Sequence, residues 1–196
     1  MAKLSGLSTT CFGLMFVWPS YTLPMLASNN TILSAPLTAG NEAMLGSLPS
    51  LGGIIGTMLV GTLIDSMGRK WSSITGSVIM MISWCIVAFT NSITVVLVAR
   101  FLGGVSCGLA LVITPIYISE IAEDRVRGIL SSVMVLLYSL GLLISYFIGW
   151  YFSYQAIAWI NFAFSAARGL MLLFVPESPV YLLKKRRVEV SRGSKK

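Results

Sequence analysis

The sequence predicts an all-α membrane protein with six spanning helices, and three observations support this prediction. Apolar residues make up 56% of the chain, charged residues make up 11%, and there is no histidine, a composition that a water-soluble domain rarely has. The apolar residues fall in six long runs, and about 20 such residues are enough for a helix to cross the hydrocarbon core. Lysine and arginine lie in alternate connections between these runs, as in chains that cross a membrane repeatedly.

The predicted spans are residues 7–27, 43–64, 71–90, 93–118, 128–150 and 156–175. The first follows Lys3, as the apolar part of a secretory signal would. It is too long for a signal, it carries Pro19 and Pro24, and no small-residue cleavage site follows it. We therefore expect this span to stay in the mature protein. The spans form one domain, residues 1–175, followed by a basic cytoplasmic tail, residues 176–196.

Positive charge predicts the orientation of the chain. Lysine and arginine are absent from the connections 28–42, 91–92 and 151–155 and occur in the connections on the other side. Because short cytoplasmic loops keep positive residues, we expect a multi-pass protein of the plasma membrane with both termini in the cytoplasm. The net charge of +7 then mostly reflects topology, and the basic tail is suited to contact with anionic lipid.

Other patterns suggest further properties. Asn29 begins an N-x-T tripeptide in a predicted outer loop and is a candidate glycosylation site. The three cysteines lie inside predicted spans, so we expect buried thiols and not disulfides. The basic stretch 184–187 is similar to a nuclear import patch, but after six spans it is interpreted as the start of a solvated helix. We expect no nucleic-acid partner, no metal and no cofactor.

A chain with few charges places three of them around one turn. Asp65, Arg69 and Lys70 flank Gly68, and glycine tolerates the left-handed backbone that a tight turn requires. Asp65 is expected to accept hydrogen bonds from the N–H groups of a neighbouring helix, and Arg69 to offer its donor fork to a carboxylate. Gly61 is expected to allow another backbone to approach closely. The alternative is an inner loop with ordinary positive charge.

Two more charged clusters fall at the same predicted membrane face. Residues 115–128 begin with Pro115, which is expected to kink a helix, and end in a short loop crowded with acids and arginines. Residues 176–187 contain a basic stretch and a single acid, Glu177. Three clusters at one face predict ion pairs that hold the helices in one conformational state and break in another.

These residues resemble the amino-terminal half of a sugar porter of the major facilitator superfamily. The family pattern G-x-x-x-D-[RK]-x-G-[RK]-[RK] is matched at Gly61, Asp65, Gly68, Arg69 and Lys70. Four later patterns, R-x-x-x-G, P-x-Y-x-x-E, R-G and P-E-S-P, are matched in order at Arg100 and Gly104; Pro115, Tyr117 and Glu120; Arg127 and Gly128; and residues 176–179. The stretches WPSYTLPML and PESPVYLL most resemble insect facilitated trehalose transporters.

The resemblance implies half of a 3+3 inverted-repeat fold that transports trehalose or a hexose by facilitative alternating access and is not an enzyme. It also implies gate ion pairs that hold the outward-open state, formed by Asp65, Arg69, Glu120, Arg127 and Glu177. Ser66 and Val180 stand where the family usually has basic residues, which suggests a looser lock.

The resemblance also implies that Val135, Tyr138 and Leu142 line the sugar cavity, on one face of a helix. Val135 stands where hexose carriers have a sugar-binding glutamine, which leaves hexose specificity open.

The first span has no acid where similar proton-coupled porters carry an aspartate, so we expect downhill transport. Of the intramembrane charges, Arg100 and Arg168, we expect Arg168 to snorkel toward the cytoplasm.

Glycine spacing predicts close helix packing inside the bundle. Gly52 with Gly56, and Gly104 with Gly108, each form a G-x-x-x-G pattern. Transporters of this fold share the substrate site between two six-helix halves. The sequence therefore leaves open a piece of a longer carrier, a truncated product, or a half that pairs with another copy. A non-transporting regulator that associates with full-length carriers is the alternative from a different functional class.

Overall fold

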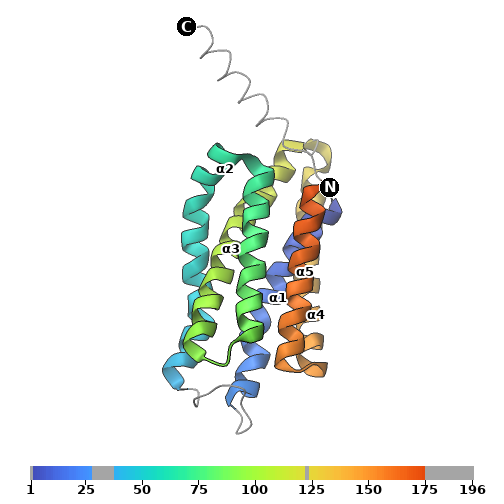
Figure 1. Cartoon of the computed structure of the whole chain (residues 1–196). Helices are drawn as coiled ribbons and strands as arrows, with labels where there is room; N and C mark the ends of the chain where they lie inside the picture. Colours follow the sequence, from blue (N-terminus) through green and yellow to red (C-terminus); the bar gives the residue numbers. More distant parts are fainter. Residues whose placement is uncertain (1, 28–37, 122–123, 175–196) are drawn as a thin grey trace, which may run out of the picture.

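The computed structural model describes the backbone of residues 2–27, 38–121 and 124–174. Its helices are α1 (Ala2–Ala27), α2 (Ala39–Phe89), α3 (Ile93–Ile121), α4 (Asp124–Tyr151) and α5 (Tyr154–Leu173). They lie side by side along one direction and form a single bundle (Figure 1). Four of them, α2 to α5, are long and apolar enough to cross a membrane. The described residues therefore confirm the all-α class with membrane-spanning helices.

Gly68 divides α2 into two helical segments. Its φ of 87° and ψ of 173° are not helical, and this positive φ is a conformation that glycine adopts without a steric penalty. Figure 1 shows the two segments folded back alongside each other. The break falls where the sequence predicts the boundary between the second and third spans. We call the end of the bundle that holds Gly68 the turn end; α3 and α5 also end there (Figure 1).

The first predicted span, α1, is not among the four candidate spans. Its hydroxyl, aromatic and proline residues lower its hydropathy, and several of these side chains are buried in the bundle. Trp18 and Thr22 are both fully buried, and the Thr22 hydroxyl donates a hydrogen bond of 2.6 Å to the Trp18 carbonyl. A helix enclosed by other helices can satisfy polar groups internally, so hydropathy underestimates its suitability for the membrane.

Two seams between helices are lined by glycine. The first segment of α2 packs on α3, where a Cβ at any of four glycines would overlap the backbone of the facing helix: Gly52, Gly56, Gly104 and Gly108. These contacts confirm the predicted G-x-x-x-G packing.

Gly13 and Gly141 form a corresponding seam between α1 and α4. The expectation for Gly61 is wrong, because a Cβ there would have no neighbour within 4 Å among the described residues.

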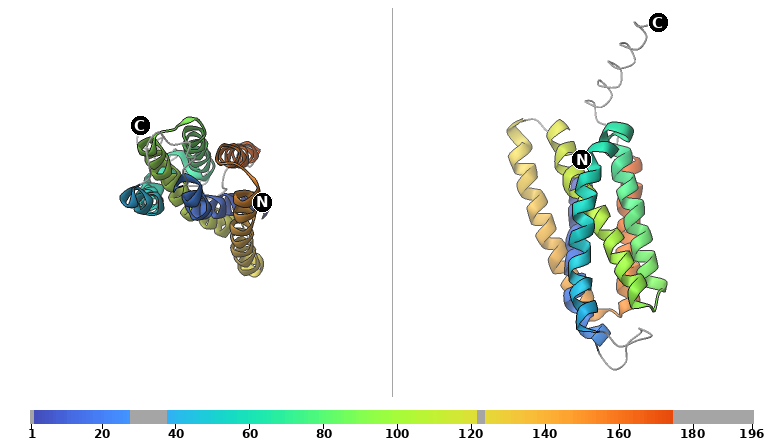
Figure 2. Two further views of the ribbon diagram at one scale, coloured as in Figure 1. Left: turned by 90° about the horizontal axis from the view of Figure 1, so that it is seen from below. Right: turned by 90° about the vertical axis from the view of Figure 1, so that its left-hand side faces the viewer.

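Aromatic side chains form the centre of the bundle away from the turn end. Trp18 packs edge-on against Trp84, with 6.1 Å between ring centroids, and lies 5.8 Å from Tyr154. The prediction of buried thiols is confirmed for Cys11 and Cys107, whereas Cys85 is only half-buried. By contrast, α4 stands at an edge of the bundle (Figure 2), and its exposed apolar side chains include Ile129, Leu136, Phe147 and Trp150.

Candidate functional site

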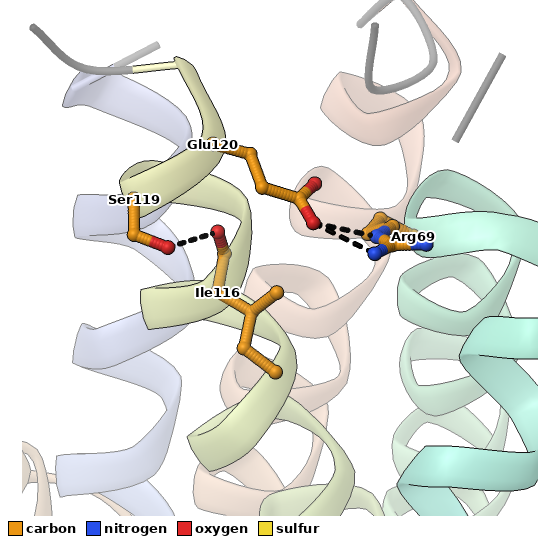
Figure 3. A network of polar contacts seen from close by, with 4 residues as sticks. All are labelled: Arg69, Ile116, Ser119 and Glu120. Atoms are coloured by element: carbon orange, nitrogen blue, oxygen red, sulfur yellow. Dashed lines mark hydrogen bonds and ion pairs between the residues drawn. The ribbon is translucent and has the colours of Figure 1, made fainter. Parts of the chain in front are cut away.

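Arg69 and Glu120, two of the predicted gate residues, meet at the turn end. The Arg69 Nη2 and Nε atoms lie 2.7 Å and 3.1 Å from the Glu120 Oε1 atom (Figure 3). The side chains are only 12% and 13% exposed, so water screens this ion pair less than it would a surface pair. The pair joins the second segment of α2 to the last turn of α3.

The same turn is attached to a second helix. Lys70 Nζ donates a hydrogen bond of 2.8 Å to the carbonyl of Leu173, the last residue of α5, where carbonyls lack helical donors and a cation is favourable. The hydroxyl of Ser72 donates to the Gly68 carbonyl at 2.6 Å, which stabilises the turn itself. The sequence predicts Lys70 to be part of a motif, but its link to α5 was not predicted, because a backbone acceptor leaves no signal in the sequence.

The remaining predicted gate and glycosylation residues are placed only in part. Asp65 is exposed, near the end of the first segment of α2. Arg127 belongs to the first turn of α4, and its side chain lies outside the described part of the chain. Glu177 and Asn29 lie outside the described residues altogether.

A pocket of about 240 Å³ lies between α1, α3 and α4. Its lining includes Val135 and Tyr138, two of the residues predicted for a sugar cavity, together with Thr9 and Phe12 of α1 and four residues of α3: Ala110, Leu111, Thr114 and Pro115. Leu142 is not among the lining residues; instead its backbone nitrogen lies against Gly13. The wall that α3 contributes to this pocket was not predicted, although Pro115 in a run of small and apolar residues was a usable signal.

The walls of this pocket are almost entirely apolar. An apolar wall can pack against the C–H face of a polar ring, but it cannot satisfy hydroxyl groups. A polyhydroxylated ligand would therefore need its hydrogen bonds from elsewhere.

Both intramembrane arginines are buried. Arg100 is 1% exposed and contacts α1. Arg168 is 2% exposed, and its Nη2 lies 3.9 Å from where a Cβ on Gly76 would stand. The expectation that Arg168 snorkels toward the cytoplasm is therefore wrong. Because Gly76 has no side chain, it leaves room for the Arg168 guanidinium inside the bundle. The Arg168 side chain therefore does not have to extend outward.

Comparison with known proteins gives consistent matches. The family model described as "Sugar (and other) transporter" matches residues 7–196. The facilitated trehalose transporter Tret1 of Polypedilum vanderplanki is 31% identical over 175 residues, which are 88% of this chain and 35% of that protein. The facilitated glucose transporter member 8 of solute carrier family 2 from Bos taurus is 29% identical over 95% of this chain and 39% of its own. The chain thus spans less than half the length of these relatives.

Solved structures show the same fold. The xylose transporter XylE from E. coli, in a partially occluded inward-open conformation, superposes with a TM-score of 0.83 at 24% identity and covers 98% of this chain and 53% of its own. The human organic anion transporter MFSD10 gives a TM-score of 0.69 at 18% identity. The bundle therefore has the architecture of one half of these transporters.

Proposed function

Since this chain belongs to the sugar transporter family of membrane proteins, we propose that it forms the amino-terminal half of a facilitative sugar carrier. The carrier works by alternating access, in which this bundle rocks against a second six-helix half around a sugar at the interface. The observation that carries the proposal is the pocket between α1, α3 and α4, because two of the residues expected to line the sugar cavity, Val135 and Tyr138, line it.

The proposed bundle has six spans in a 3+3 inverted repeat, with each segment of α2 counted as one span. Helix packing supports this arrangement. The first segment of α2 packs on α3 across one glycine seam, and α4 packs on α1 across the other. In a 3+3 inverted repeat, spans 1, 2 and 3 correspond to spans 4, 5 and 6. The α2–α3 seam joins spans 2 and 4, and the α1–α4 seam joins spans 5 and 1, so the two seams correspond to each other. The second α2 segment and α5 face each other at Ser77 and Gly169, and the same correspondence maps this pair onto itself.

We assign the gate to the charged residues of the turn end. The Arg69–Glu120 pair supports this assignment because it is a little-exposed ion pair between α2 and α3 at the end of the bundle where the charged motifs lie. Asp65, Arg127 and Glu177 complete the proposed set, which holds the outward-open state. In this proposal the turn end and both termini face the cytoplasm at the plasma membrane, in keeping with the positive residues there.

Arg100 supports facilitative rather than proton-coupled transport. A buried arginine beside a carboxylate would make a titratable pair suited to proton coupling. Here the guanidinium contacts the sulfur and carbonyl oxygen of Met15 and the ring of Trp18, none of which changes charge near neutral pH. The substrate that we propose is trehalose or a hexose, packed against the apolar pocket and hydrogen-bonded mainly by the second half.

Uptake of labelled trehalose and glucose into oocytes tests the proposal. The chain is expressed alone and together with the carboxy-terminal half of the Polypedilum vanderplanki relative, with surface biotinylation to confirm arrival at the plasma membrane. We expect saturable uptake with the second half and none without it. Saturable uptake by the chain alone would show that this bundle is sufficient. No uptake in either case, despite arrival at the surface, would contradict the carrier proposal and favour a regulator.

Substitution of Val135 by glutamine is expected to strengthen hexose binding in the paired carrier. Val135 lies on the pocket wall and is 65% exposed, so a side-chain amide there can reach a sugar hydroxyl. One added hydrogen bond of about 1 kcal/mol lowers the KM for glucose by roughly fivefold. The matched control is Leu136→Gln, because Leu136 is 68% exposed but is not a lining residue. An equal change in KM for both variants would contradict the assignment of Val135 to the sugar site.

A further inference from the structure

The carbonyl of Met15 lacks its ordinary helical donor. In an α-helix this oxygen accepts a hydrogen bond from the N–H four residues later, and that residue is Pro19, which has no N–H. Met15 is 1% exposed, so water cannot replace the donor. An unsatisfied carbonyl is especially costly inside a membrane protein, and α1 therefore needs a donor from another helix at this point.

Arg100 of α3 provides that donor. Its Nη2 atom lies 2.9 Å from the Met15 carbonyl oxygen, and its Nη1 atom lies 2.9 Å from the Met15 sulfur. The guanidinium carbon lies 4.6 Å from the centroid of the Trp18 ring, close enough for a cation–π interaction. Among the described residues, the groups seen to contact the Arg100 guanidinium are those of Met15 and Trp18. Both residues lie in the turn of α1 that Pro19 interrupts.

We propose that Arg100 is a positioning residue that replaces the N–H missing at Pro19 and so fixes the course of α1 against α3. The same helix carries Thr9 and Phe12, which line the pocket one to two turns before Met15. Loss of the donor frees α1 to bend at Pro19, which moves one wall of the pocket. The inference rests on contacts between α1 and α3 and is independent of the proposed transport.

A double-mutant cycle on the full 196-residue chain tests this relation. Arg100→Met removes the donor, and Pro19→Ala restores a backbone N–H to the Met15 carbonyl. Pro24→Ala is the matched control, because Pro24 is also inside α1 but leaves the carbonyl of Ser20 without its donor, at an exposed position. Each variant is purified in detergent, and its Tm is measured from tryptophan fluorescence.

We expect Arg100→Met to lower Tm by about 5 °C more in the chain with Pro19 than in the Pro19→Ala variant. The shift in the Pro24→Ala background should equal that in the original chain. The difference between backgrounds is the informative quantity, because removal of a buried charge by itself changes Tm in every background. Equal shifts in all three backgrounds would overturn the proposal.

Two further measurements keep the test decisive if Arg100→Met folds poorly. Arg100→Lys retains one donor and should show less than half of the Tm loss. Modification of Cys11 by a maleimide, followed by peptide mass spectrometry, reports on α1 one turn before Met15. The rate should rise about tenfold in Arg100→Met, as expected for easier local opening, and return to its original value in Pro19→Ala/Arg100→Met. An unchanged rate in folded Arg100→Met would contradict a positioning role.

Discussion

Alanine at Gly104 is expected to disrupt the α2–α3 seam of the bundle. The added Cβ would overlap the carbonyl oxygen of Pro49 and lie 2.7 Å from the Pro49 Cα. These are backbone atoms, which cannot turn aside as a flexible side chain can. The two helices must therefore separate along the seam and lose dispersion contacts on both sides.

Overpacking of this kind costs about 3 kcal/mol, which corresponds to a decrease in Tm of about 9 °C for a chain of this size. Gly108→Ala should behave similarly, because its Cβ would overlap the Gly53 carbonyl. Gly61→Ala is the matched control: Gly61 is also inside α2, but a Cβ there meets no described neighbour within 4 Å. That control should hold or raise Tm, since alanine favours helix. Equal Tm values for Gly104→Ala and Gly61→Ala would contradict the packing.

Replacement of Glu120 by glutamine is expected to slow the transport cycle of the paired carrier while surface expression stays largely intact. Glutamine has nearly the same shape as glutamate but leaves the Arg69 guanidinium facing a neutral group. Loss of a largely buried pair of this kind costs about 2 kcal/mol. If the pair holds the outward-open state, the balance between states shifts about 30-fold toward the inward-open state.

Uptake rate normalised to surface protein measures this effect. Glu42→Gln is the matched control, because Glu42 is an exposed acid in the first turn of α2. The charge-swapped variant Arg69→Glu/Glu120→Arg should recover part of the lost rate, since it keeps opposite charges on the two helices. An original rate in Glu120→Gln, or no recovery in the swapped variant, would contradict the gate assignment.

Much of the fold could be predicted because the membrane imposes a strong pattern on the sequence. Long apolar runs predicted α2 to α5, and Gly68 between charged residues predicted the turn. Arg69 and Glu120 were each predicted as gate residues because both fall in charged clusters at one predicted membrane face, but their pairing with each other was not predicted. The G-x-x-x-G pairs predicted a seam because small residues are a condition of close helix contact.

The errors share one physical cause: a helical pattern does not tell which neighbour covers a given face. Gly61 has the small side chain of a seam residue but no described helix opposite it. Arg168 was expected at the cytoplasmic surface because an arginine so near a helix end usually extends to water. Each outcome was decided by tertiary packing.

The burial of Arg168 also bears on how the chain enters the membrane during synthesis. An arginine inside a spanning helix raises the cost of inserting that helix by itself, even where, as here, it lies nearer the end of the helix than its centre. Arg168 is 2% exposed and lies beside Gly76 of α2, and α2 is synthesised before α5. We therefore expect α5 to enter the membrane at least cost once α2 is in place to surround this arginine.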